Sequence, residues 1–201
     1  MIEWFQKGGP VMWPILACSI FALAIFLERL FALKRSKIIP DDFLKGVEDL
    51  LRHNKTSEAQ ALCQQSSSKV ATVLEMGIKN QGKTRARIKE SIEEVGKRES
   101  QELSRYVGAL ATIAHISPLL GLLGTVTGMM RVFQVITEKG VGNAQSLAGG
   151  ISEALITTIA GLIVAIPTVV AFRFLNARVK ELITEMEDHS LRMMEFLIKG
   201  D

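Results

Sequence analysis

Three residues within or next to long uncharged segments of this sequence could bind an ion or line its path. They are Thr125, Glu153 and Thr158. A threonine hydroxyl donates and accepts hydrogen bonds, so sparse hydroxyls on a surface of small residues can line a narrow, partly wet passage. The alternative is that both threonines bond to carbonyls of their own helices and serve packing alone. Glu153 is either a functional carboxylate that faces protein or water, or an interfacial charge among headgroups.

Small residues accompany both threonines at helical spacing, and residues three and four apart share one face of a helix. The two faces predicted in this way comprise Ala114, Ser117, Gly121, Thr125 and Gly128, and Ala154, Thr158, Gly161, Ala165 and Thr168. Small residues let helix backbones approach closely in lipid. The residues expected to pack the two segments together are Gly121, Gly124, Gly128, Gly161 and Ala165.

No Asp, Glu, Lys or Arg occurs in the central part of these segments, and His115 is interpreted as a hydrogen-bonded helix contact. A protein that carries protons needs a group that binds and releases one within the membrane field, where moving one charge through 100 mV is worth about 2.3 kcal/mol. If the chain uses an ion gradient, the titrating group must therefore come from another chain. The sequence also has no HExxH, GxSxG or Walker motif, so it predicts no enzyme activity, no cofactor and no metal site. The net charge of +3 gives no argument for nucleic acid.

Three uncharged runs, 11–27, 106–130 and 154–172, are long enough to predict membrane spans. A hydrocarbon core about 30 Å thick needs about 20 helical residues. The first run reaches that length if its helix continues through Glu28 and Arg29 toward Leu33. Its leading flank is a poor signal-peptide n-region and no small-residue cleavage site follows, so we expect an uncleaved anchor.

The basic residues predict the orientation of these spans. Segment 34–105 holds fifteen of the 24 Lys and Arg residues and the segment from 173 holds five, whereas the N-terminal tail holds only Lys7. The positive-inside rule then places the N-terminus outside, and segment 34–105 and the C-terminus inside. Cys18 lies in a span and Cys63 in the inside segment, so we expect no disulfide between them.

Amphipathic patterns predict helices in the inside segment. One starts near Asp41 after Pro40, and Ser57 with Gln60 resembles a capping box for a second, which ends near 66–69. A further helix is expected to run from Thr84 straight into the second span, and another follows the third span. Without a Pro- or Gly-rich linker, the membrane and inside parts are expected to form one continuous helical unit.

The sequence thus predicts an all-α integral membrane protein with three transmembrane helices, two of them extended into a cytoplasmic helical bundle. The predicted segments are an outside tail (1–10), transmembrane helix 1 (11–33), a cytoplasmic helical segment (34–105), transmembrane helix 2 (106–136), an outside connection with the start of helix 3 (137–153), transmembrane helix 3 (154–175) and a cytoplasmic C-terminal helix (176–201).

Two motifs resemble those of the MotA/TolQ/ExbB proton-channel family. They are GLLGTVTGM, which follows Ser117-Pro118-Leu119-Leu120, and GISEALITTIAGLIVAIPTVV at 150–170. The Glu28-Arg29 pair that ends the first span also fits. Three spans, an outside N-terminus and a large inside segment match the ExbB and TolQ branch, whereas the flagellar stator branch typically has four spans. The third-span motif favours ExbB over TolQ.

The resemblance implies a subunit of a bacterial inner-membrane motor. Relatives form a pentameric ring whose second and third spans line a pore, and the pore holds a single-span partner, similar to ExbD or TolR, with one essential Asp. On this resemblance the pore threonines fall on Thr125 and Thr158, and the acidic residue of the third-span motif falls on Glu153. Thr127 departs from relatives that carry a bulkier residue there.

Three roles remain open on the sequence. An ExbB-like subunit would power siderophore or cobalamin uptake through a TonB-like protein, and a TolQ-like subunit would serve envelope integrity. A non-conducting membrane scaffold that oligomerises and presents its helical inside domain is the third role. The paired small-residue faces, each with a hydroxyl, favour a channel because a scaffold does not require them.

Overall fold

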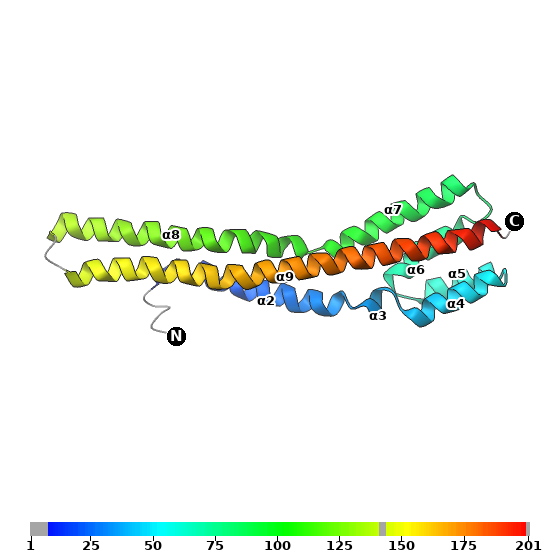
Figure 1. Cartoon of the computed structure of the whole chain (residues 1–201), viewed down its shortest axis with the longest axis horizontal. Helices are drawn as coiled ribbons and strands as arrows, with labels where there is room; N and C mark the ends of the chain where they lie inside the picture. Colours follow the sequence, from blue (N-terminus) through cyan, green and yellow to red (C-terminus); the bar gives the residue numbers. More distant parts are fainter. Residues whose placement is uncertain (1–7, 141–143, 200–201) are drawn as a thin grey trace. The chain divides into compact units, whose positions relative to one another are not determined.

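The computed structural model describes residues 8–140 and 144–199, and every regular element within these ranges is an α-helix (Figure 1). The predicted all-α class is therefore confirmed. Most of the predicted N-terminal tail lies outside the described residues. The helices are α2 (Met12–Ala32), α3 (Arg35–Ile38), α4 (Asp41–Arg52), α5 (Thr56–Gln65), α6 (Lys69–Lys79), α7 (Arg85–Ser104), α8 (Val107–Lys139) and α9 (Ala144–Lys199).

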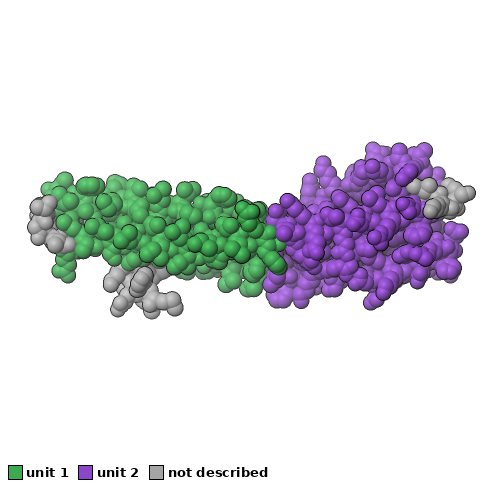
Figure 2. All heavy atoms as spheres, viewed as in Figure 1, with its two compact units in different colours: residues 1–28, 106–174 green, residues 29–105, 175–201 purple. Residues whose placement is uncertain are grey.

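Three of the helices, α2, α8 and α9, are long and apolar enough to cross a bilayer. The chain is thus a multi-pass membrane protein. Contacts group Met1–Glu28 with Tyr106–Phe174 into one compact unit, unit 1 (Figure 2). Large apolar side chains such as Phe21, Leu119 and Ile163 are exposed on it. Apolar side chains on the outside of a unit suit a lipid environment or contact with other chains.

Unit 2 comprises Arg29–Arg105 and Leu175–Asp201. Its helices α4, α5, α6 and α7 each contact the next in sequence. The core includes the fully buried side chains of Val47, Leu74, Ile88 and Leu182. Contacts therefore divide the chain into two units rather than the single unit expected from the lack of a linker, although α9 is one continuous helix with residues in both.

The helix expected to run from Thr84 into the second span is interrupted. α7 ends at Ser104 and α8 begins at Val107. Arg105 is extended and Tyr106 adopts a left-handed conformation with φ of 64°. Neither residue is a glycine or proline, so no turn residue in the sequence signals a break here. A non-glycine residue in this region carries a backbone cost of about 1–2 kcal/mol, so the surrounding structure must hold it there.

Two further expectations in unit 2 are corrected. Ser57 and Gln60 form no capping box, because α5 already begins at Thr56 and its first turn has no side-chain cap. α6 is a separate helix that was not among those predicted. Its six buried residues are Val70, Ala71, Val73, Leu74, Gly77 and Ile78. They recur at three- and four-residue spacing, so the signal for this helix was present in the sequence.

Ion pairs join the helices of unit 2. Arg35 contacts Asp41 at the start of α4 (Nη1 to Oδ2, 2.7 Å) and Glu185 on α9 (Nε to Oε1, 2.8 Å). Its guanidinium holds the pKa of the Asp41 carboxyl below its usual value through hydrogen bonds. Glu99, the residue that interrupts the apolar pattern of α7, is buried there. Its carboxylate pairs with Lys69 at 2.8 Å.

The two cysteines are unpaired, Cys63 buried and Cys18 half-buried. Burial raises the pKa of the Cys63 thiol to about 12, with a smaller effect from Glu75. A thiol with so high a pKa is a poor nucleophile and behaves as a small apolar residue.

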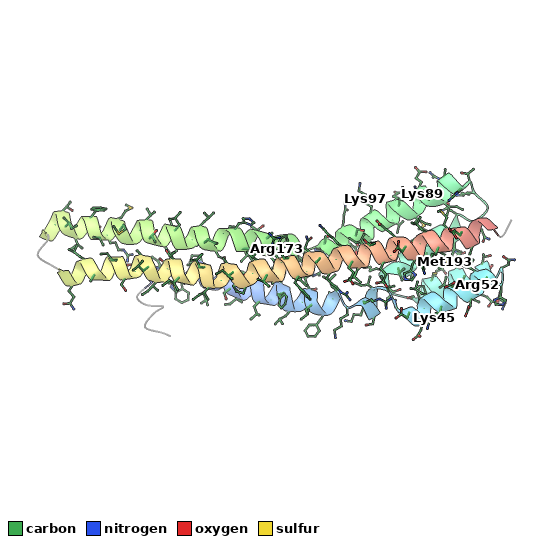
Figure 3. All side chains as sticks on the ribbon, viewed as in Figure 1. Lys45, Arg52, Lys89, Lys97, Arg173 and Met193 are labelled. Carbon is green, nitrogen blue, oxygen red and sulfur yellow. The ribbon has the colours of Figure 1, made fainter. Side chains whose placement is uncertain are left out.

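Basic side chains such as Lys45, Arg52, Lys89 and Lys97 extend from the helices of unit 2 (Figure 3).

Candidate functional site

The candidate site is the seam between α8 and α9 in unit 1, where the two helices run antiparallel. Glycine backbones make the contact. A Cβ on Gly121 would lie 3.1 Å from the Thr158 Cα, one on Gly128 would lie 2.8 Å from the Gly150 carbonyl oxygen, and one on Gly161 would lie 2.6 Å from the Ser117 carbonyl oxygen. Any side chain at these positions would push the helices apart. The structure thus places these three glycines where close backbone approach requires them.

Gly124 and Thr157 meet near the middle of the seam. A Cβ on Gly124 would lie 2.1 Å from Thr157 Oγ1 and 2.4 Å from its Cβ. Thr157 is fully buried, and its hydroxyl donates to the carbonyls of Glu153 and Ala154, each at 3.0 Å. Sequence reasoning assigned Thr158 to the small-residue face and missed Thr157. The signal was present, since Thr157 lies three residues after Ala154.

The hydroxyl of Thr158 reaches across the seam. It donates to the Gly121 carbonyl on α8 at 3.3 Å and to the Ala154 carbonyl on its own helix at 3.2 Å. Thr125 donates only within α8, to the Leu122 carbonyl at 2.6 Å. Both side chains are half-buried. If the two threonines served packing alone, their hydroxyls would bond to backbone carbonyls, as they do here. Each hydroxyl oxygen can still accept a hydrogen bond from a further partner.

Both threonines lie on one side of the seam. Thr125 follows Gly124 by one residue, and Thr158 follows Thr157 by one residue. One residue turns an α-helix by about 100°, since a turn takes 3.6 residues. Because α8 and α9 run in opposite directions, this rotation carries the two side chains to the same side. They therefore belong to one strip of surface, which we call the threonine strip.

Glu153 lies on the other side of the seam. It precedes Thr157 by four residues, slightly more than one turn back along the helix. Its side chain is therefore rotated from Thr157 in the sense opposite to the step from Thr157 to Thr158. Its carboxylate is paired with Arg131 of α8, whose Nη1 lies 2.7 Å from Oε1 and 2.5 Å from Oε2. The main chain at Gly9, before α2, lies against the same carboxylate. The structure thus brings Thr125 and Thr158 together and separates Glu153 from them.

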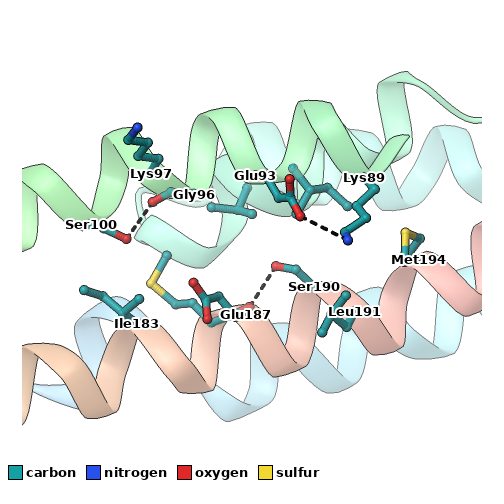
Figure 4. Close-up of a pocket in the computed structure, with 13 residues that line it drawn as sticks. Lys89, Glu93, Gly96, Lys97, Ser100, Ile183, Glu187, Ser190, Leu191 and Met194 are labelled. Atoms are coloured by element: carbon teal, nitrogen blue, oxygen red, sulfur yellow. Dashed lines mark hydrogen bonds and ion pairs between the residues drawn. The ribbon is translucent and has the colours of Figure 1, made fainter. Parts of the chain in front are cut away.

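Apart from the seam, a hollow lies in unit 2, between α7, α9 and α6 (Figure 4). Its volume is about 530 Å³, and its floor is apolar, with Val73, Ile183 and Met194. Some of its polar groups bond locally: Ser190 donates to the Met186 carbonyl at 2.8 Å and Lys89 lies 3.4 Å from Glu93. The hollow lies in unit 2, outside the uncharged runs that could span a membrane, so we do not treat it as the functional site.

The fold and the seam define a class: a multi-pass α-helical membrane protein with two spans held in glycine contact and hydroxyls along one side. A family model described as "MotA/TolQ/ExbB proton channel family" matches residues 55–188. The chain belongs to this family. The match begins just before α5 and ends within α9, so it includes the whole α8–α9 seam, both threonines and Glu153.

Several curated proteins are similar to this chain, two of them over most of its length. The biopolymer transport protein ExbB-like 3 of Synechocystis sp. is 33% identical over 185 residues, which covers 90% of this chain and 88% of the relative. The Tol-Pal system protein TolQ of Haemophilus influenzae is 33% identical over 180 residues, covering 82% and 77%. The biopolymer transport protein ExbB of Aquifex aeolicus is 40% identical over 87 residues, covering 43% and 59%.

Proposed function

We propose that the chain is the channel subunit of an ExbB–ExbD-like motor in the bacterial inner membrane. In this proposal several copies, five by analogy with the family, surround a shared axis, with the N-terminus in the periplasm and the C-terminus in the cytoplasm. The motor uses the proton motive force to power outer-membrane transport through a TonB-like protein. Relatives named ExbB support this role. The relative named TolQ supports the alternative, a subunit of an envelope-integrity system.

The observation that carries the proposal is the threonine strip. It offers two half-buried hydroxyls on one side of a glycine seam, within helices that carry no Asp, Glu, Lys or Arg from Val107 to Met130 or from Ala154 to Phe172. Hydroxyls can order water or a partner's polar group, but they do not release protons at physiological pH. The strip therefore suits the wall of a passage rather than its proton carrier.

The missing carrier identifies the partner's chemistry. A carboxylate within the membrane field can bind and release a proton, and such a group is costly in lipid unless protein or water surrounds it. We therefore propose a single-span partner of the ExbD or TolR kind, whose intramembrane Asp lies against Thr125 and Thr158 when the copies assemble. Its cycle of protonation would move it relative to the ring.

Threonine-to-valine variants test this role, because the exchange removes a hydroxyl with little change in shape. Thr125→Val and Thr158→Val should reduce gradient-driven work, measured as energised uptake in cells, by about tenfold or more if each hydroxyl contributes about 1.4 kcal/mol. The protein and its single-span partner should remain at wild-type amounts in the membrane.

A matched control lies on α8, next to the threonine strip. Thr127 also bonds to its own backbone, but it lies outside the strip. Thr127→Val should leave uptake close to wild type. If all three variants behave alike, or if the strip variants work normally, the passage role of Thr125 and Thr158 is wrong and the scaffold role gains support.

A further inference from the structure

Toward the loop end of the α8–α9 hairpin, the buried carboxylate of Glu153 pairs with the exposed Arg131, and the proposed channel does not use this pair. The Glu153 side chain is 11% exposed, while that of its partner Arg131 is 52% exposed. A single guanidinium nitrogen, Nη1, contacts both carboxylate oxygens. Removing a carboxylate from water is costly unless a charged donor compensates it. Arg131 supplies that donor, while its own remaining N–H groups stay accessible to water or headgroups.

A third segment meets this pair. A Cβ on Gly9 would lie 2.0 Å from Glu153 Oε1, and Gly9 has a φ of +69°, a conformation that favours glycine. Its neighbour Gly8 approaches Met12 of α2 and Ile156 of α9 in the same way. The chain entering α2 is thus pressed directly onto the carboxylate. Glu153 joins α9 to α8 through Arg131 and to the entry of α2 through Gly9.

Position separates this pair from the threonine strip. Arg131 follows Gly128 by three residues, which is 60° short of a full turn, so its side chain is rotated in the sense opposite to the step from Gly124 to Thr125. Glu153 precedes Thr157 by four residues, which likewise rotates its side chain away from Thr158. Both side chains therefore turn to the side of the seam opposite Thr125 and Thr158. A carboxylate there, already in contact with a permanent cation, is not placed to exchange protons with a group that moves along the strip.

We propose that Arg131 is the positioning residue for Glu153, and that the pair is a fixed clasp between the three spans rather than a proton-binding site. This clasp comprises Arg131, Glu153 and the main chain at Gly9. The proposal depends on the proposed function only where activity is measured, because the clasp itself is a property of the folded chain. It assigns Glu153 a role different from the ion-pathway role that the family resemblance implies.

Glutamine variants test the clasp, because the effect of Glu153→Gln on the melting temperature should change sign when Arg131 is also replaced. Arg131→Gln leaves a buried carboxylate without its cation and should lower the melting temperature of the detergent-solubilised protein by about 5 °C. Glu153→Gln alone leaves a cation that water can reach and should lower it less. In the Arg131→Gln background, however, Glu153→Gln should raise the melting temperature, because it removes the unpaired charge and two amides can bond. If it fails to do so, the clasp is refuted.

Activity then decides what Glu153 contributes. With membrane amounts matched, the double variant R131Q/E153Q should support energised uptake within about threefold of wild type. If the double variant recovers its melting temperature but does not support uptake, the charge itself is used and the fixed-clasp role is wrong. Normal uptake by the strip variants would overturn the proposed function instead, while the sign reversal in melting temperature would still test the clasp.

Discussion

Single residues set the separation of α8 and α9. Gly124 is the clearest case, since the space for its side chain is occupied by the Thr157 side chain. The sequence predicted that glycines would face the partner helix, because small residues recurred at helical spacing. It could not predict which threonine lies at the centre of the seam, since Thr157 and Thr158 differ by one residue and the spacing allows both. It also gave no sign that Arg131 pairs with Glu153, because this contact depends on how the hairpin closes.

We expect Gly124→Ala to destabilise the protein by about 1–3 kcal/mol, because even a methyl group would overlap Thr157 and force the helices apart. Thermal unfolding followed by circular dichroism in detergent measures the change. Gly108→Ala is the matched control on the same helix, since nothing lies within 4 Å of its added Cβ. It should be neutral or slightly stabilising. Equal melting temperatures for the two variants would contradict the close seam.

At the scale of elements, the sequence predicted the three spans and the ends of several helices well, because long uncharged runs and turn residues are local signals. α5 ends at Gln65, just before the predicted end near 66–69. The break before α8 could not be predicted, since the left-handed residue there is Tyr106. Tyrosine has no local preference for this conformation, so local sequence signals do not reveal the break.

The turn between α4 and α5 offers a test of local backbone chemistry. Asn54 has a φ of 57°, and the amides of Asn54 and Lys55 bond back to the carbonyls of Leu51 and Leu50. Asn54→Gly should leave stability unchanged or slightly raised, whereas Asn54→Val should lower it by about 1 kcal/mol, because a β-branched residue is strained there. Thermal melts of the two variants make the comparison. A valine variant as stable as the glycine variant would contradict the left-handed turn.

The ion pairs of Arg35 predict a pH dependence for unit 2. The hydrogen bond from Arg35 lowers the pKa of the Asp41 carboxyl. A lowered folded-state pKa gives stability that is present above the unfolded value of about 3.9 and is lost as the pH falls through the folded value. Arg35→Gln should therefore lower the melting temperature at pH 7 and have a smaller effect at pH 3.

A suitable control for that experiment is Arg87→Gln, which removes an exposed pair with Glu90 within α7. Exposed pairs of this kind contribute little, about 0–1 kcal/mol. Its melting temperature should differ little from wild type at either pH. If Arg35→Gln has the same effect at pH 3 as at pH 7, the Asp41 pair does not contribute as described.

At the scale of the whole molecule, an ion-driven role requires a second kind of chain. The spans of this protein supply close packing and hydroxyls, but no Asp, Glu, Lys or Arg from Val107 to Met130 or from Ala154 to Phe172. An ion gradient can do work only through a site that changes its charge or occupancy within the field. The family and the relatives named ExbB and TolQ agree with a protein that acts in an assembly.

The most direct test of this requirement is proton flux into liposomes that carry a membrane potential. Vesicles should contain this chain alone, this chain with a co-expressed single-span protein of the ExbD kind, or the same pair with the partner's membrane Asp replaced by Asn. We predict gradient-driven flux only for the intact pair, and background flux for the chain alone and for the Asp→Asn pair. Equal flux from the chain alone would contradict the account, because the protein would then carry protons without any carboxylate from outside.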